Sequence, residues 1–148
     1  MRYVAPGWGT GELWLEGDCL LWHELPRPGD GAAQGSHPLA DRFVAYLAGE
    51  RDEFGDVELD LDWCTPFERE LVAAIRSVPY GETVTYGELA ALAGRPGAAR
   101  AAGSFCARNR AGLVLPCHRV VAAGGLGGYG ALGLEYKRRL LLLEGARV

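Results

Sequence analysis

The strongest constraint on the fold of this chain is a nine-residue stretch at positions 113–121, with the sequence LVLPCHRVV. Apolar residues flank a thiol, an imidazole and a guanidinium. The run is too short for a helix, and its Val and Leu content is typical of a buried strand or strand end. A buried cysteine is usually an inert small hydrophobic residue. The adjacent histidine and arginine instead favour the thiolate, which is the nucleophilic form. We therefore expect a buried strand that presents a reactive Cys117.

The net charge of −4 conceals an uneven distribution along the chain. Residues 1–62 hold four arginines against thirteen acidic residues, a net charge of −9, whereas residues 63–148 hold eleven basic against six acidic residues, a net charge of +5. Between Leu89 and Leu134 the sequence has five arginines and no acidic residue. A stretch of one sign suits a phosphate backbone, although a solvated basic face is an equally good interpretation on charge alone.

A length of 148 residues, 49% of them hydrophobic, allows one domain or two small ones. We predict an N-terminal α/β domain at residues 1–62 and a mainly helical domain at residues 63–148. In the first, alternation at 12–16 and an apolar run at 20–22 predict a hairpin. The pattern beyond it indicates a loop at 26–38, a helix at 38–47 and a strand with a linker at 52–62.

The cysteines offer no metal or redox motif. The four, at positions 19, 64, 106 and 117, lack a close CxxC pair, so we expect free thiols in a reducing compartment. Cys19 and His23 supply only two ligands, and we predict no metal. No apolar run approaches the roughly 20 residues that span a bilayer, and the N-terminus lacks a signal pattern. We therefore expect a cytoplasmic protein without a membrane contact.

The second domain begins with a helix-start signal. Thr65 is suited to the N-cap, Pro66 to the first helical position and Glu68 to a capping box. Downstream, residues 86–93 and 98–108 indicate two helices joined by a Gly-containing turn, which fits a helix-turn-helix. The second of these is rich in Ala and Gly, so another surface could approach it closely; two small helices packed internally are the alternative. A glycine-rich loop and a last helix at 134–144 complete the domain.

The segment PCHRV resembles the active-site motif of the O6-alkylguanine-DNA alkyltransferases, also called methylated-DNA-protein cysteine methyltransferases. TPFxRxL from Thr65 and VPYGETVTYGELA from Val78 are also similar to this family, so the resemblance runs from about Thr65 to the C-terminus. It implies a small N-terminal α/β support unit with short antiparallel strands. It also implies a C-terminal DNA-binding and alkyl-acceptor domain with a winged helix-turn-helix-like motif.

The resemblance also implies an activity: DNA repair by direct, irreversible transfer of an alkyl group, such as methyl, from O6-alkylguanine to Cys117. O4-alkylthymine is a candidate second substrate. The protein would act once, as a monomer on double-stranded DNA, with no cofactor. The damaged base would be flipped out of the duplex, which costs a few kcal/mol.

Site residues follow from the resemblance, position by position. Cys117 would be the nucleophile, and His118 would take its proton, through a water because neighbouring side chains of an extended segment point apart. Glu144 would orient the imidazole, although by itself it is typical of a solvated residue. Asn109 matches the hinge between the recognition helix and the active-site strand, with an ordinary helix cap as the alternative.

Further residues would contact the DNA or the base. Arg100 matches the arginine finger that fills the gap left by the flipped nucleotide, and Tyr86 matches the tyrosine that helps to turn the base out and gives it a proton. Additional DNA contacts are expected from Arg95, Ala99, Gly103 and Arg108. The substrate pocket is expected to include Tyr129, Val120 and Arg119.

Two departures from the family pattern concern the pocket. Arg110 follows Asn109 where relatives commonly have Pro, and residues 129–133 are bulkier than the usual run of small residues. We therefore expect transfer of methyl and poor acceptance of benzyl or larger groups.

The same residues leave two alternative functions. A protein that only recognises alkylated bases is disfavoured, because relatives of that kind lack the cysteine. A Cys-His hydrolase is disfavoured because such enzymes place Cys and His far apart in sequence and carry an oxyanion-hole loop that is not found here.

Overall fold

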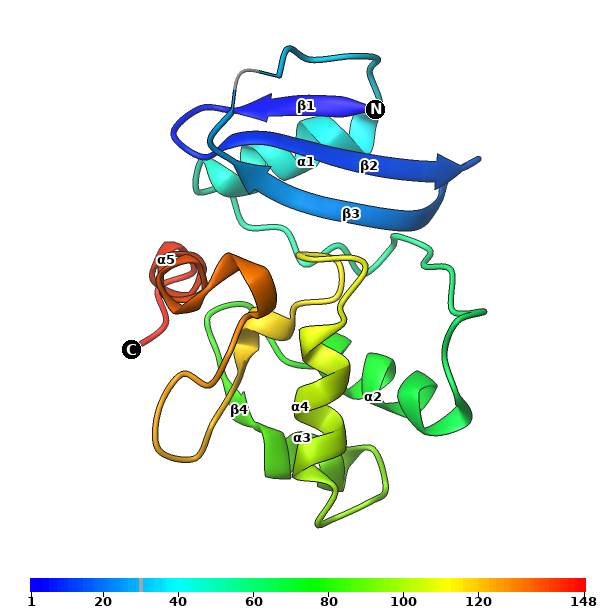
Figure 1. The fold of residues 1–148 in the computed structure, drawn as a ribbon, viewed down its shortest axis with the longest axis vertical. Coiled ribbons are helices and arrows are strands. Elements are labelled where there is room, and N and C mark those ends of the chain that lie inside the picture. The colour runs from blue at the N-terminus through cyan, green and yellow to red at the C-terminus, as the bar shows by residue number, and fades with distance from the viewer. Residues whose placement is uncertain (30) are drawn as a thin grey trace. The chain divides into compact units, whose positions relative to one another are not determined.

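The computed structural model describes residues 1–29 and 31–148 (Figure 1). These residues form two compact units. The first comprises Met1–Asp60 together with Arg110–Leu113, and the second comprises Leu61–Asn109 together with Val114–Val148. The first unit thus receives a four-residue segment from far along the chain. The roles predicted for residues 1–62 and 63–148 stay predictions.

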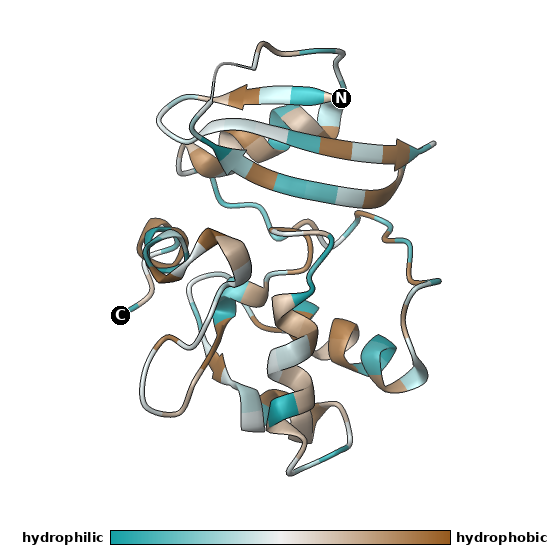
Figure 2. Ribbon diagram, in the orientation of Figure 1, coloured by the Kyte–Doolittle hydropathy of each residue, from teal (hydrophilic) through white to brown (hydrophobic). Residues whose placement is uncertain are grey.

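The first unit is built on a three-stranded antiparallel sheet in the order β1-β2-β3, formed by Arg2–Ala5, Gly9–Glu16 and Cys19–Arg27. The predicted hairpin is confirmed as β2 and β3, whereas β1 was not predicted. Brown and paler bands alternate along the distal half of β2 in Figure 2, as expected of a strand with one buried face. Helix α1, Pro38–Leu47, is confirmed.

The strand predicted within residues 52–62 is wrong. Leu59 makes one isolated bridge to Leu20, and the described structure has no regular strand in that range. The acidic composition of the range explains this outcome, because too few of its residues are apolar to bury one face of a strand.

Segment Arg110–Leu113 is held in the first unit by His23 of β3. The His23 backbone N–H donates to the Arg110 carbonyl at 2.7 Å, and its ring Nδ1 donates to the Gly112 carbonyl at 2.6 Å. Because a carbonyl only accepts, the ring proton lies on Nδ1, and Nε2 accepts from the Tyr3 hydroxyl at 2.7 Å. The ring stacks on Phe43. Burial lowers the pKa of His23 to about 4, so the ring is neutral.

The second unit contains α2, Pro66–Arg76, whose predicted capping box between Thr65 and Glu68 is confirmed. A second capping box, between Thr85 and Glu88, opens α3 and was not predicted. The remaining elements of this unit are α3 at Tyr86–Leu92, α4 at Ala99–Ala107, α5 at Leu134–Leu143, the strands β4 at Val84–Thr85 and β5 at Val120–Val121, and the short 3-10 helices η1 at Cys117–Arg119 and η2 at Gly130–Leu132.

The strand predicted at 113–121 is mostly wrong. Only Val120–Val121 is a strand, paired in parallel with Val84–Thr85, and Cys117 lies in η1. Pro116 explains the difference, because proline has no N–H to give to a ladder. Its carbonyl instead accepts from the Arg119 N–H at 3.0 Å, which closes the 3-10 turn.

No helix in the described part of the chain is long and apolar enough to cross a membrane.

Candidate active site

Cys117 is the first residue of η1, and its side chain is buried with 1% of the residue exposed. Its backbone N–H donates to the Leu115 carbonyl at 2.8 Å. The same carbonyl accepts from the side-chain amide of Asn109 at 2.9 Å, and this amide also hydrogen-bonds the Cys117 thiol. Asn109 follows α4 and precedes the segment that joins the first unit. The Asn109 side chain therefore holds the backbone just before Cys117.

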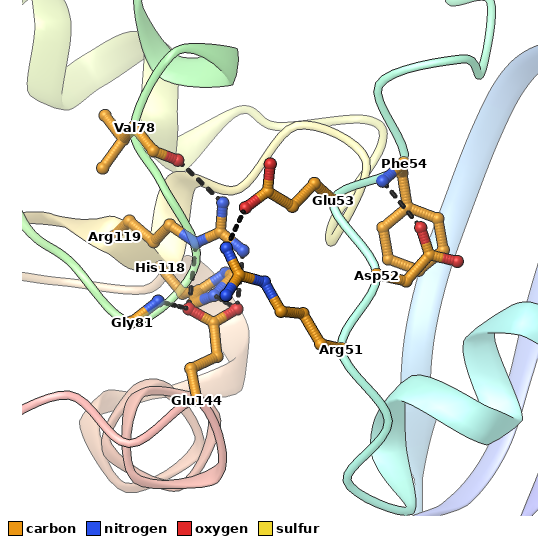
Figure 3. A network of polar contacts seen from close by, with 9 residues as sticks. All are labelled: Arg51, Asp52, Glu53, Phe54, Val78, Gly81, His118, Arg119 and Glu144. Carbon is orange, nitrogen blue, oxygen red and sulfur yellow. Dashed lines mark hydrogen bonds and ion pairs between the residues drawn. The ribbon is translucent and has the colours of Figure 1, made fainter.

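Glu144, the C-cap residue of α5, is the centre of a buried polar network (Figure 3). One of its oxygens lies 2.9 Å from His118 Nε2 and 2.8 Å from Arg119 Nη2. The other accepts from Arg119 Nε at 2.9 Å and from the Gly81 N–H at 3.2 Å. Arg119 Nη1 donates to the Val78 carbonyl at 2.8 Å. The carboxylate is thus held on both oxygens by groups from separate parts of the unit.

The charges in this network decide which atom of His118 can accept a proton. Burial alone would raise the pKa of Glu144, but the hydrogen bonds from His118 and Arg119 hold it well below its usual range. An ionised carboxylate only accepts, so His118 Nε2 carries the ring proton. Burial lowers the pKa of His118, so its ring is neutral near pH 7. Its basic atom is then Nδ1, which is itself buried.

The thiol of Cys117 is protonated in this environment. Burial raises its pKa well above the ordinary value, the neighbouring Cys106 thiol raises it further, and the Lys137 charge and the Asn109 hydrogen bond act the other way. The expectation that His118 and Arg119 favour the thiolate is wrong for the free protein. His118 is neutral, and the charge of Arg119 is paired with Glu144.

Lys137 was missed in the sequence. Its side chain is fully buried in α5, and Nζ donates to the Val120 carbonyl at 2.5 Å, to the Gly128 carbonyl at 3.1 Å and to the Tyr86 hydroxyl at 3.4 Å. Burial lowers the pKa of Lys137 to about 8. The run Lys-Arg-Arg looks like a solvated helix face. The available signal was that Lys137 precedes Leu140 and Leu141 by three and four residues and so falls on the buried stripe.

The predicted DNA-contacting residues lie on or near α3 and α4. Arg100 is exposed on the first turn of α4, and the Gly103 backbone lies against the Tyr86 ring, where an added Cβ would meet ring carbons at 3.8 Å. Two of the arginines already have partners. Arg95 lies over the Phe67 ring at 4.6 Å, and Arg108 forms an ion pair with Glu68 at 2.8 Å. Ala99 is half-buried at the start of α4.

Of the three residues predicted for the substrate pocket, Tyr129 is affected by the acceptor, because burial and then the nearby Cys117 raise its pKa well above the ordinary value. Tyr129 is half-buried, with its ring centroid 6.3 Å from that of Tyr136. Val120 is fully buried in β5. Arg119, placed in the pocket by the sequence, lies instead in the Glu144 network, because its guanidinium is occupied by the carboxylate and a backbone carbonyl.

The sequence and the fold were compared with known proteins. A family model described as "6-O-methylguanine DNA methyltransferase, DNA binding domain" matches residues 66–146. The methylated-DNA-protein-cysteine methyltransferase of Mycolicibacterium paratuberculosis is 47% identical over 124 residues, which cover 83% of this chain and 69% of that protein. The protein of the same name from Methanopyrus kandleri is 42% identical over 128 residues, covering 83% of this chain and 95% of that protein.

Solved structures agree with these matches. The crystal structure of Mycobacterium tuberculosis OGT in complex with DNA is similar with a TM-score of 0.80 and 38% identity, covering 97% of this chain and 91% of that chain. This likeness confirms the predicted fold class, α/β with a helical DNA-binding part. With the family motif seated in a buried cysteine-histidine-glutamate arrangement, the matches show that this chain belongs to the methylated-DNA-protein-cysteine methyltransferase family.

Proposed function

We propose that this protein repairs DNA by moving an alkyl group from the O6 atom of guanine to the sulfur of Cys117. The sulfur attacks the alkyl carbon, the carbon–oxygen bond breaks, and its electron pair goes to the base, which takes up a proton. The product is a thioether, so each molecule acts once and needs no cofactor. The observation that carries the proposal is the buried Cys117 beside a His118 whose partner is the ionised Glu144.

The proton of the thiol needs an acceptor, because burial keeps Cys117 protonated. His118 Nδ1 is that acceptor. Successive side chains of a 3-10 helix are about 120° apart, so Cys117 and His118 do not face each other and a water carries the proton between them. Glu144 stabilises the imidazolium that forms, and Arg119 keeps Glu144 ionised and correctly turned.

The leaving guanine needs a proton, and Tyr86 is the donor that the geometry favours. Its hydroxyl lies 3.4 Å from Lys137 Nζ. An ammonium group at this distance stabilises the tyrosinate that forms when the proton leaves. The same charge lowers the pKa of the Cys117 thiol. Lys137 therefore acts on both the attacking sulfur and the proton donor, as a positioning and electrostatic residue.

The DNA partner is bound by the α3 and α4 helices. Exposed Arg100 takes the place of the flipped nucleotide, and the small side chains of α4 let the duplex approach. We propose that the acidic first unit supports the second without binding DNA, because its charge would repel phosphates. The protein would act as a monomer in the cytoplasm.

The test is a mass measurement after incubation with a duplex that contains O6-methylguanine. Repair adds one methyl group to the peptide that holds Cys117 and leaves plain guanine in the DNA. A protein that only recognises alkylated bases would shift the duplex in a gel and stay unmodified, and a hydrolase would do neither. A Cys117→Ser variant, which should bind the duplex and take no methyl group, identifies the acceptor.

A further inference from the structure

A second cysteine lies beside the proposed acceptor. Cys106 is on the last turn of α4 and half-buried, and its thiol is close enough to Cys117 to raise the pKa of that residue. The backbone holds the two residues in place. The Cys106 carbonyl accepts from the Asn109 N–H at 3.2 Å, the Asn109 amide donates to the Leu115 carbonyl at 2.9 Å, and the Cys117 N–H donates to the same carbonyl at 2.8 Å.

Alkyl transfer as proposed above gives Cys106 no part. A second thiol in this place even opposes it, because Cys106 raises the pKa of Cys117. Both thiols also act on the pKa values of the same two groups, Tyr86 and Lys137. Because Cys106 disfavours the thiolate of Cys117, we expect a role for Cys106 other than in alkyl transfer.

We propose that Cys106 is a resolving thiol, which captures Cys117 after oxidation by a peroxide and stores it as a reducible disulfide. In the first step His118 Nδ1 takes the proton of the Cys117 thiol, and the thiolate attacks the peroxide. The O–O bond breaks, Cys117 becomes a sulfenic acid, and the departing hydroxide takes the proton back and leaves as water. In the second, the sulfur of Cys106 attacks the sulfenyl sulfur, the S–O bond breaks, and a second water leaves. Two thiols are oxidised, and one molecule of hydrogen peroxide is reduced.

The geometry favours this reaction over further oxidation. A disulfide needs about 2.05 Å between sulfurs, and Cys106 is the neighbouring thiol that acts on Cys117. Hydrogen peroxide is much smaller than the alkylated base that must reach the same sulfur. Without a neighbouring thiol, the sulfenic acid proceeds to sulfinic and sulfonic acids, which cellular thiols do not reverse.

The benefit rests on the proposed function. A protein that spends its single acceptor sulfur on one lesion would otherwise be lost to a peroxide before meeting DNA. A disulfide protects the sulfur from oxidation to sulfinic and sulfonic acids, and a dithiol restores the free thiol by thiol–disulfide exchange.

Peptide mapping after hydrogen peroxide treatment tests the proposal without DNA. The folded, full-length protein should yield a disulfide-linked pair of peptides that hold Cys106 and Cys117, and dithiothreitol should separate them. In Cys106→Ser, the same treatment should carry Cys117 to sulfinic or sulfonic acid, which dithiothreitol does not reverse. Cys64→Ser removes another half-buried cysteine of the second unit and should behave as the wild type.

The proposal is overturned if wild-type Cys117 reaches the sulfinic acid while Cys106 stays a free thiol, if Cys117 pairs with any other cysteine, or if peroxide leaves both thiols unchanged. Methyl transfer from an O6-methylguanine duplex is measured separately, before treatment and after dithiothreitol. Loss on oxidation and recovery on reduction link the disulfide to repair. An untreated protein that takes no methyl group would refute the proposed function while leaving the disulfide result to stand on its own.

Discussion

The Nε2 atom of His118 lies 2.9 Å from a carboxylate oxygen of Glu144, and neither side chain is exposed to solvent. A buried carboxylate in this position stabilises a positive imidazole far more than a solvated one would, because little water screens the pair. Removing this carboxylate would also be costly, because it is the counter-charge of the buried Arg119.

Glu144→Gln should therefore lower the rate of methyl transfer by roughly 10²- to 10⁴-fold, the usual contribution of general-base catalysis, because His118 loses the carboxylate that stabilises its protonated form. It should also lower the free energy of unfolding by about 3 kcal/mol, because the buried Arg119 loses its counter-charge. Single-turnover transfer and urea denaturation measure the two effects. Glu135→Gln, at an exposed position of the same helix, should change neither. A rate within a factor of about two of the wild type would remove Glu144 from the proton path.

Lys137→Met should slow methyl transfer roughly tenfold or more at neutral pH, because removing the ammonium raises the pKa of Cys117, and one pKa unit is tenfold in thiolate. The pH dependence is the sharper measurement. The pKa of Lys137 is lowered to about 8, so the wild-type rate should decline as the pH rises through that value and the charge is lost. The variant should lack this decline.

Arg138→Met is the matched control for Lys137, because it removes the neighbouring cation on α5, which lies outside the buried cluster. The Arg138→Met variant should keep both the wild-type rate of methyl transfer at neutral pH and the decline of that rate at higher pH. If Lys137→Met reproduced the wild-type profile, the charge of Lys137 would have no effect on the reacting sulfur.

Local patterns predicted the parts of this fold that depend on neighbours in sequence. The start of α2 followed from Thr65 and Glu68, three residues apart, because a capping box is a local arrangement. The hairpin of β2 and β3 followed from alternation around one turn. The pairing of Val84 with Val120 could not be predicted in this way, because it depends on the packing of chain segments far apart in sequence.

The candidate site shows the same limit. Cys117 and His118 stand out as neighbours, whereas the partners that set their protonation come from other elements: Glu144 and Lys137 from α5, and Asn109 from the end of α4. The adjacent Arg119 suggested a stabilised thiolate. The guanidinium of Arg119 is instead paired with the carboxylate of Glu144. Residues that are adjacent in sequence do not face one another in a 3-10 turn.

Arg100→Ala should weaken transfer from a duplex more than transfer from free O6-methylguanine base. The free base needs no flipping, so only the duplex reaction loses the side chain that fills the vacated stack. A loss of about 2 kcal/mol, or roughly 30-fold, is expected for the duplex. Arg69→Ala, which removes an exposed arginine of α2, provides the control for a general loss of positive charge. An equal fall for both substrates would show that Arg100 is not the finger.

The buried His23 should make stability depend on pH. Its pKa is about 4 in the folded protein and 6.5 when unfolded, so between these values the unfolded chain binds more protons and the free energy of unfolding falls as the pH falls. From about pH 7 to about pH 5, this loss should be about 2 kcal/mol. His23→Gln should lack it, whereas His37→Gln, which keeps His23, should retain it. Urea denaturation at both pH values measures the difference, and equal slopes in wild type and His23→Gln would mean that the ring of His23 is not held neutral between Gly112 and Tyr3.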